Sequence, residues 1–155
     1  MTKLTALLFL VSFSLSSTVL ANEQKHQDKA MMTGLDTPAA QVITSFHNAL
    51  KSGDKEQARA ALADNVMIFE GGNVERSADQ YAHHHMLSDM KYLADMTSET
   101  LEHQVKIIGN TAISTSRSHT KGVFKGKERD YQSMETMVLE NQNGDWKIIH
   151  IHWSN

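Results

Sequence analysis

Histidine is the residue type most suited to chemistry in this chain, because nine of its 155 residues are histidine and none is cysteine. His150 and His152 lie two residues apart in the strand-like segment that ends the sequence. Side chains two residues apart in a strand share a face, so both imidazoles could reach one metal ion or one anionic ligand, or transfer protons near neutral pH. The alternative is that the opposite face, with Ile149, Ile151 and Trp153, is the buried one. The two histidines would then face solvent or another subunit.

A second set of ionisable side chains lies around the run of three histidines at 83–85. Consecutive residues of an α-helix point about 100° apart, so the three imidazoles cannot all serve one site. Helical spacing places His83 among apolar residues, whereas His85 lies on a polar stripe with Asp89 one turn later. The spacing alone does not decide which of these histidines faces a pocket.

Carboxylates give a third set of candidates. Glu135 interrupts a mostly nonpolar row in an alternating, strand-like segment. A buried carboxylate must find a partner or take up a proton, so Glu135 is a candidate base or ligand if that row faces the interior, and an ordinary residue if it faces outward. Glu70 and Glu75 are weaker candidates of the same kind, and His47 and His103 look like surface residues.

The helices that would carry these residues are predicted from Thr37 onward. Thr37 is a typical helix cap, a proline follows it, and apolar residues then recur at helical spacing until Gly53. A second, shorter helix begins at Asp54. A capping-box pattern that starts at Ser77 predicts a third helix, which continues to about Asp95.

Strand-like segments account for most of the remaining sequence. One apolar run precedes the third helix and four alternating segments follow it, at 66–70, 101–108, 112–121, 129–140 and 146–153. Short turns with glycine or asparagine separate the last four, which is typical of hairpins. This order predicts an α+β fold in which three N-terminal helices pack on one face of a strongly curved antiparallel sheet.

The first 21 residues read as a secretory signal peptide, with Lys3 ahead of an apolar stretch and cleavage expected near Ala21. The stretch is shorter than the roughly 18 to 20 residues of a membrane-spanning helix, so we expect no stable membrane insertion after cleavage. We expect a periplasmic or secreted protein with a flexible leader over 22–36 and one domain over 37–155. The net charge of −3 and the lack of basic runs argue against nucleic acid as a partner.

Together, the order of elements and the ending at 145–154 resemble the SnoaL-like branch of the nuclear transport factor 2-like superfamily. Further matching pieces are Phe69-Glu70-Gly71-Gly72, Glu75-Arg76-Ser77, Tyr81 with His85 and Asp89, and Glu135-Thr136-Met137-Val138-Leu139. The resemblance covers 37–155 and implies a cone-shaped half-barrel that encloses a pocket, often in a homodimer. It does not imply one activity, because the superfamily includes isomerases, dehydratases, polyketide cyclases, ligand binders and association modules.

On the third helix, the resemblance nominates His85 and Asp89 as the inward pair. We therefore expect a histidine-lined pocket for a small organic molecule. The expected catalytic residues are His85, Asp89, Glu135 and His152, and the expected ligand-binding residues are Glu70, Tyr81, His150 and Ser154. The reaction would be proton abstraction and return next to a carbonyl, or a related dehydrating or hydrolytic step. Whether the protein is an enzyme or a non-catalytic binder stays open.

Two other functions are compatible with the sequence. A periplasmic metal-binding protein would hold zinc or copper through His85, His150 and His152, and no other cofactor is indicated. A homodimeric association module without catalysis would use the outer face of the sheet, with Ile149, Ile151 and Trp153 as the contact.

Overall fold

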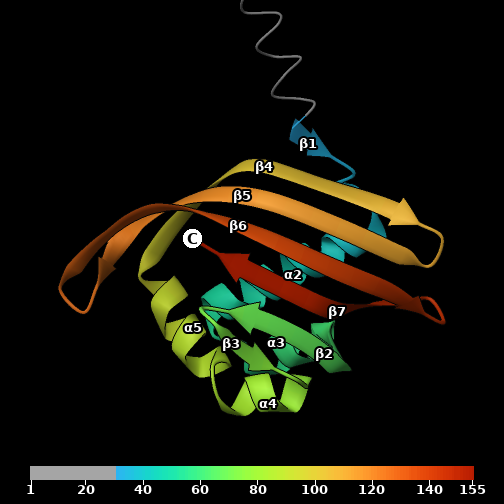
Figure 1. The fold of residues 1–155 in the computed structure, drawn as a ribbon, viewed down its shortest axis with the longest axis horizontal. Helices are drawn as coiled ribbons and strands as arrows, with labels where there is room; N and C mark the ends of the chain where they lie inside the picture. Colours follow the sequence, from blue (N-terminus) through green and yellow to red (C-terminus); the bar gives the residue numbers. More distant parts are fainter. Residues whose placement is uncertain (1–30) are drawn as a thin grey trace, which may run out of the picture. The chain divides into compact units, whose positions relative to one another are not determined.

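The computed structural model describes residues 31–155, in which four helices lie against one face of a seven-stranded, strongly curved sheet (Figure 1). The predicted signal peptide and most of the predicted leader lie outside the described residues. The expected α+β architecture with helices on a curved sheet is confirmed. Over 31–155, no helix has both the length and the apolar character needed to cross a membrane.

The first two helices begin and end where the sequence predicts. Helix α2 (Pro38–Ser52) starts at Thr37, whose hydroxyl accepts a hydrogen bond of 3.3 Å from the backbone N–H three residues later. It ends at Gly53, which has φ +79° and therefore suits the left-handed conformation of a helix C-terminus. Helix α3 (Lys55–Ala61) is capped by Asp54 in the same way as α2. These caps fix how both helices enter the fold.

The predicted third helix is instead two short helices, α4 (Ala78–His83) and α5 (Met86–Ala94). The backbone leaves the helical conformation at His84, where φ is −107° and ψ is −81°. Next to the break, the His85 imidazole forms a hydrogen bond with the carboxylate of Glu75 instead of continuing a helix surface. The assumption of a continuous helix, on which the spacing of the three histidines was judged, is therefore wrong.

The strands pair in the order β1-β4-β5-β6-β7-β2-β3. Their bounds are β1 Met32–Thr33, β2 Leu62–Glu70, β3 Asn73–Glu75, β4 Met96–Ile108, β5 Thr111–Phe124, β6 Lys127–Gln142 and β7 Asp145–Ser154. The long hairpins from β4 to β7 are antiparallel, as predicted, but β2 runs parallel to β7 and β1 runs parallel to β4. The sheet is therefore mixed, and it places the end of β2 beside the end of the chain.

Strand β1 corrects the predicted extent of the leader. Met32 pairs with His103 of β4, so the ordered domain begins before Thr37. The chain then turns at Gly34, where φ is +69° and an added Cβ would lie 2.1 Å from the carbonyl oxygen of Val105. Only glycine fits so close to the neighbouring strand. Met32 and Thr33 thus form the sheet edge, and the turn at 34–36 joins them to α2.

A bulge in β7 determines which side chains face the helices. Leu139 of β6 pairs with Ile148, whereas its neighbour Val138 pairs with His150, so Ile149 is an extra residue in β7. A one-residue insertion reverses the alternation of side chains beyond it. Simple alternation over the whole segment, which the sequence suggested, is therefore interrupted.

Beyond the bulge, Ile151 and Trp153 point toward the helices and join the core, and Ile151 is fully buried. His150 and His152 point to the opposite, outer face, where both lie against the Phe69 ring. The contact face expected for an association module is wrong for Ile151 and Trp153, because both side chains pack inward. The residues buried between the sheet and the helices form one core.

Candidate functional site

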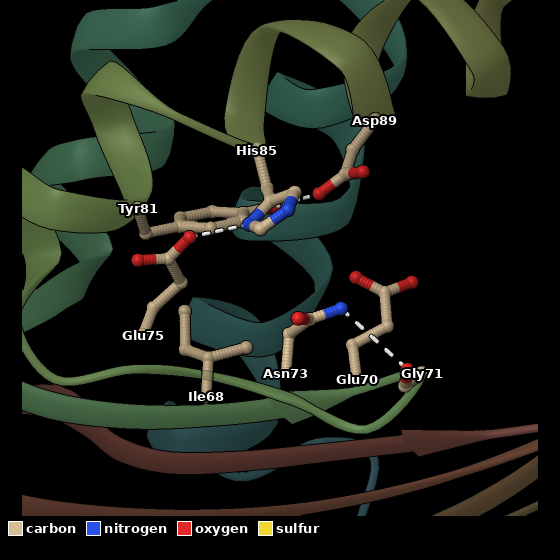
Figure 2. A pocket seen from close by; sticks show the side chains of 8 residues that line it. All are labelled: Ile68, Glu70, Gly71, Asn73, Glu75, Tyr81, His85 and Asp89. Atoms are coloured by element: carbon tan, nitrogen blue, oxygen red, sulfur yellow. Dashed lines mark hydrogen bonds and ion pairs between the residues drawn. The ribbon is translucent and has the colours of Figure 1, made fainter.

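A cavity of about 220 Å³ lies between the end of β2 and the two short helices (Figure 2). Its lining is contributed by β2, β3, α4 and α5 and by the residues that connect them. The lining residues are Ile68, Glu70, Gly71, Asn73, Glu75, Tyr81, His85 and Asp89. Four of the predicted site residues, Glu70, Tyr81, His85 and Asp89, therefore come together here.

Local sequence signals position this cavity. Gly71 and Gly72 have φ of +55° and +83° and form the tight turn between β2 and β3, which brings Glu70 opposite Asn73. Helix α4 is capped by Ser77, whose hydroxyl accepts a hydrogen bond of 3.0 Å from a backbone N–H of its first turn. The turn and the cap place one wall on the sheet and the other on the helices.

Tyr81 and Asp89 form the hydrogen bond at the back of the cavity. The Tyr81 hydroxyl donates to Oδ2 of Asp89 at 2.8 Å, and Tyr81 is fully buried. Burial raises the pKa of Tyr81, so its hydroxyl stays protonated and remains a donor. Burial also raises the pKa of Asp89, and the hydrogen bond from Tyr81 and the nearby His85 only partly oppose this. Asp89 is thus a carboxyl that retains a proton to a higher pH than usual.

Glu70 lies on the opposite wall, with its carboxyl group turned across the cavity toward His85 and Asp89 (Figure 2). Partial burial raises the pKa of Glu70, and the negative charge of Asp89 raises it further. A carboxyl group with a raised pKa exchanges protons more readily near neutral pH than an ordinary one, so Glu70 and Asp89 are candidates for acid and base catalysis.

Glu75 is more closely involved in this site than the sequence predicted, where it was only a weaker candidate. Its side chain is 6% exposed, its Oε1 forms a hydrogen bond with Nδ1 of His85, and its Oε2 lies 3.6 Å from Nδ1 of His84. Oε2 has no hydrogen-bond partner within residues 31–155. The break between α4 and α5 is what brings two consecutive histidines to one carboxylate. Helical spacing could not show this.

Glu135 lies apart from this cavity, in a cluster of its own. Its Oε2 accepts hydrogen bonds from Nε2 of His47 at 2.8 Å and from the indole N–H of Trp153 at 2.6 Å. The Glu135 side chain is 10% exposed and that of His47 is 43% exposed. His103, whose Nε2 lies 2.9 Å from Oγ of Ser114, is the other nearby imidazole.

The hydrogen bonds within this cluster set the direction of its pKa shifts. Burial alone would raise the pKa of Glu135, but the charge of His47 and the hydrogen bonds from His47 and Trp153 outweigh it, so the pKa is lowered. Burial would lower the pKa of His47, but the charge and hydrogen bond of Glu135 outweigh it, so the pKa is raised. The pair is therefore stable as an ion pair.

The prediction that His47 and His103 are surface residues missed their polar partners: both residues are half-buried, and they bond Glu135 and Ser114 respectively. His47 lies on the helix face that also carries the fully buried Ile43, four residues before it, and Leu50, three residues after it. That spacing was the signal that could have placed His47 on the inner face of α2.

The remaining predicted site residues lie on the outer face of the sheet. His150 and His152 contact Phe69, with ring centroids 5.5 and 6.4 Å apart, and Ser154 pairs with Met134 on that face. The expected convergence of His85, Asp89, Glu135, His150 and His152 in one cavity is wrong. In the described part of the chain, no three His, Asp or Glu side chains are arranged to hold a metal ion, and His150 and His152 face away from His85.

Comparison with known proteins places this geometry in context. A family model described as a SnoaL-like domain matches residues 39–155. A solved structure from Shewanella frigidimarina, provisionally described as a ketosteroid isomerase, shares 52% sequence identity, covers 79% of this chain and 98% of its own, and superimposes with a TM-score of 0.77. No curated protein matches the chain.

More distant structures share the fold alone. A nuclear transport factor 2-like protein from Salmonella enterica is 18% identical over 74% of this chain and 86% of its own, with a TM-score of 0.63. The association domain of CaMKII from C. elegans is 19% identical over 87% of this chain and 98% of its own, with a TM-score of 0.62. Enzymes and assembly modules therefore both use this architecture.

Proposed function

Because the chain belongs to the SnoaL-like domain family, we propose that it binds a small organic molecule in the Glu70–Asp89 cavity and moves a proton next to a carbonyl group, as an isomerase does. The observation that carries the proposal is the Tyr81–Asp89 hydrogen bond facing Glu70 across one cavity. The relative from Shewanella frigidimarina, with its provisional description as a ketosteroid isomerase, supports the choice of a ketone as substrate.

Each group has a distinct task in this proposal. Protonated Asp89 donates a hydrogen bond to the carbonyl oxygen, while the Tyr81 hydroxyl stabilises the negative charge that grows on Asp89 as its proton moves. Glu70 accepts a proton from the carbon next to the carbonyl, which leaves an enol, and returns the proton to a different carbon as the carbonyl reforms. The double bond shifts, and both carboxyl groups recover their starting protonation.

Glu75 and His85 support the cavity without taking part in the proton transfer. Glu75 holds the imidazole of His85 through Nδ1, which leaves Nε2 as the nitrogen free to contact a ligand. The His85 ring therefore forms a fixed wall of the cavity. Its exposed side chain, at 47%, also marks where a ligand enters.

The test is isomerisation of a β,γ-unsaturated ketone, followed by the absorbance of the conjugated product. Glu70→Gln and Asp89→Asn should each lower kcat about 100-fold or more, because each removes a proton acceptor or donor at the reacting atoms. Glu99→Gln changes an exposed glutamate on β4 and is the matched control, with full activity expected. Wild-type turnover in Glu70→Gln would refute the assignment of the base.

A second candidate function, homodimeric association, is supported by the outer face of the sheet. Met134 is 60% exposed and Ile113 is 38% exposed on that face, and the fold is shared with an association domain. Exposed apolar side chains on a sheet face are typical of protein contacts. Met134→Asp should convert a dimer to a monomer in analytical ultracentrifugation, and a wild-type monomer at working concentration would rule this function out.

A further inference from the structure

The cavity itself limits which molecules it can accept. We propose that the ligand is an uncharged ketone or aldehyde with on the order of ten non-hydrogen atoms, and that carboxylates, phosphates and molecules as large as a steroid are excluded. This inference rests on the proposed function and names the substrate class for the same site. Size, charge and the position of Trp153 each support it.

Size is set by the cavity volume. At about 220 Å³, the cavity is moderately larger than a cavity of about 150 Å³, which holds one benzene molecule. It is smaller than the roughly 300 to 1,000 Å³ of sites that bury drug-sized ligands. A single ring or a short chain with its carbonyl group fits within this volume, whereas a fused-ring skeleton would extend beyond it.

Trp153 packs against Tyr81, one of the residues that line the cavity. Its ring packs against Tyr81 with centroids 6.2 Å apart, and its indole N–H is held by Glu135 at 2.6 Å. Glu135 is in turn bonded to His47 on α2. A ligand cannot extend past Tyr81 into the core unless this chain of contacts is broken.

Charge separates neutral ligands from anions. The lining contains three carboxylic side chains and one imidazole, His85, and it contains no lysine or arginine. Glu70 is the carboxylate that accepts a proton in the proposed reaction, and it lines the cavity. An anionic ligand would bring another negative charge close to it, with no guanidinium or ammonium group to receive that charge.

An ammonium ligand would complement the negative charge of the lining, but it would not suit the proposed proton transfer. A cation between Glu70 and Asp89 would favour the ionised form of both carboxyl groups. Asp89 would then lack the proton that it donates to a carbonyl oxygen. An uncharged carbonyl compound accepts that hydrogen bond and leaves Glu70 free to act as the base, so it is the ligand that the lining fits.

Four probes test the inference: cyclohex-3-enone, its ring-carboxylated analogue, an aminomethyl analogue that is cationic at neutral pH, and a β,γ-unsaturated ketosteroid. Binding is measured by calorimetric titration, independently of turnover. We expect the uncharged small ketone to bind at least about tenfold more tightly than the carboxylate. The steroid should bind at least about tenfold more weakly than the small ketone because the cavity cannot bury it.

Glu70→Gln is the matched variant for the charge argument. It removes one negative charge without changing side-chain size. The difference in binding affinity between the neutral and the carboxylated ketone should therefore fall to about threefold or less. Glu99→Gln, at an exposed position near the start of β4, should leave this difference in affinity unchanged. If Glu70→Gln leaves the difference in affinity unchanged, the charge of the lining does not select against anions.

The outcomes separate this inference from the proposed function. If the small ketone binds best but no ketone is isomerised, the proposed function fails and the substrate class stands. If isomerisation occurs but the steroid, the carboxylate or the amine binds as tightly as the small ketone, the function stands and the substrate class fails. Failure of all four probes to bind overturns the substrate class.

Discussion

Two acidic clusters lie side by side on the inner face of the sheet, and they differ in what surrounds each carboxylate. Glu70 of β2 pairs with Trp153 of β7, and Trp153 pairs with Glu135 of β6, so the two glutamates belong to one row across three strands. The pKa of Glu70 is raised and that of Glu135 is lowered. Residue type and position in the sheet therefore do not determine the chemistry.

Hydrogen-bond donors account for the difference. Glu135 receives two of them, from His47 and Trp153, which hold it as a carboxylate although only 10% of its side chain is exposed. The charged neighbour that most affects Glu70 is another carboxylate, Asp89, which opposes ionisation. Glu135 thus stabilises the fold through a satisfied ion pair, whereas Glu70 retains the reactivity that proton transfer requires.

The largest change in the free energy of unfolding should come from Glu135→Gln. The substitution keeps the shape but removes a buried charge that accepts two hydrogen bonds, so it should lower the free energy of unfolding by about 2 kcal/mol. Urea denaturation followed by circular dichroism measures this. Glu128→Gln, at an exposed position of the same strand, should change it by less than about 0.5 kcal/mol. Equal losses in the two variants would show that the hydrogen bonds of Glu135 do not stabilise the fold.

Much of the fold could be predicted from the sequence, because its signals are local. The cap at Thr37, the left-handed glycine at Gly53 and the hairpin turns placed most elements, and the SnoaL-like resemblance is confirmed. Glu70, Tyr81, His85 and Asp89 were named as site residues and do meet in one cavity. Glu70 and Tyr81 lie close in sequence to a turn and a helix start that were predictable, whereas His85 and Asp89 were nominated by the family resemblance.

The errors came from features that only tertiary structure determines. The bulge at Ile149 reverses the alternation of β7 and places His152 on the outer face, so the expectation that His152 and Glu135 serve one pocket was wrong. The partner of Glu135 is instead His47, 88 residues away on another element. Neither a strand insertion nor a helix-to-sheet contact leaves a periodic signal in one sequence.

An intermediate effect should appear in the pH dependence of stability. The raised pKa of His47 gives stability that is complete below its ordinary value of 6.5 and lost as pH rises through the folded value. The lowered pKa of Glu135 gives stability that is complete above 4.5 and lost as pH falls through its folded value. The ion pair should therefore stabilise the fold most between pH 4.5 and 6.5.

The comparison of wild type with His47→Gln measures this window. The difference in free energy of unfolding should be about 1 kcal/mol between those pH values, reduced from a fully buried pair because His47 is 43% exposed, and it should decline on both sides. His83→Gln, at an exposed position of α4, should give a difference that does not peak in this range. A difference that rises steadily through pH 8 would contradict the ion pair.

The smallest change in the free energy of unfolding should come from Glu70→Gln, and it should be a gain in stability. Because the pKa of Glu70 is raised in the fold, its ionised form is less favourable there than in the unfolded chain, so a neutral side chain should stabilise the protein at pH 7. Glu70 is exposed to solvent on one side, which limits the gain to about 0.3 kcal/mol. The gain should shrink as pH falls toward 4.5, because wild-type Glu70 then takes up a proton itself. Urea denaturation at pH 7 and pH 5 measures both values, and a loss of stability at pH 7 would mean that Glu70, like Glu135, is held by favourable partners and is not a group kept free for proton transfer.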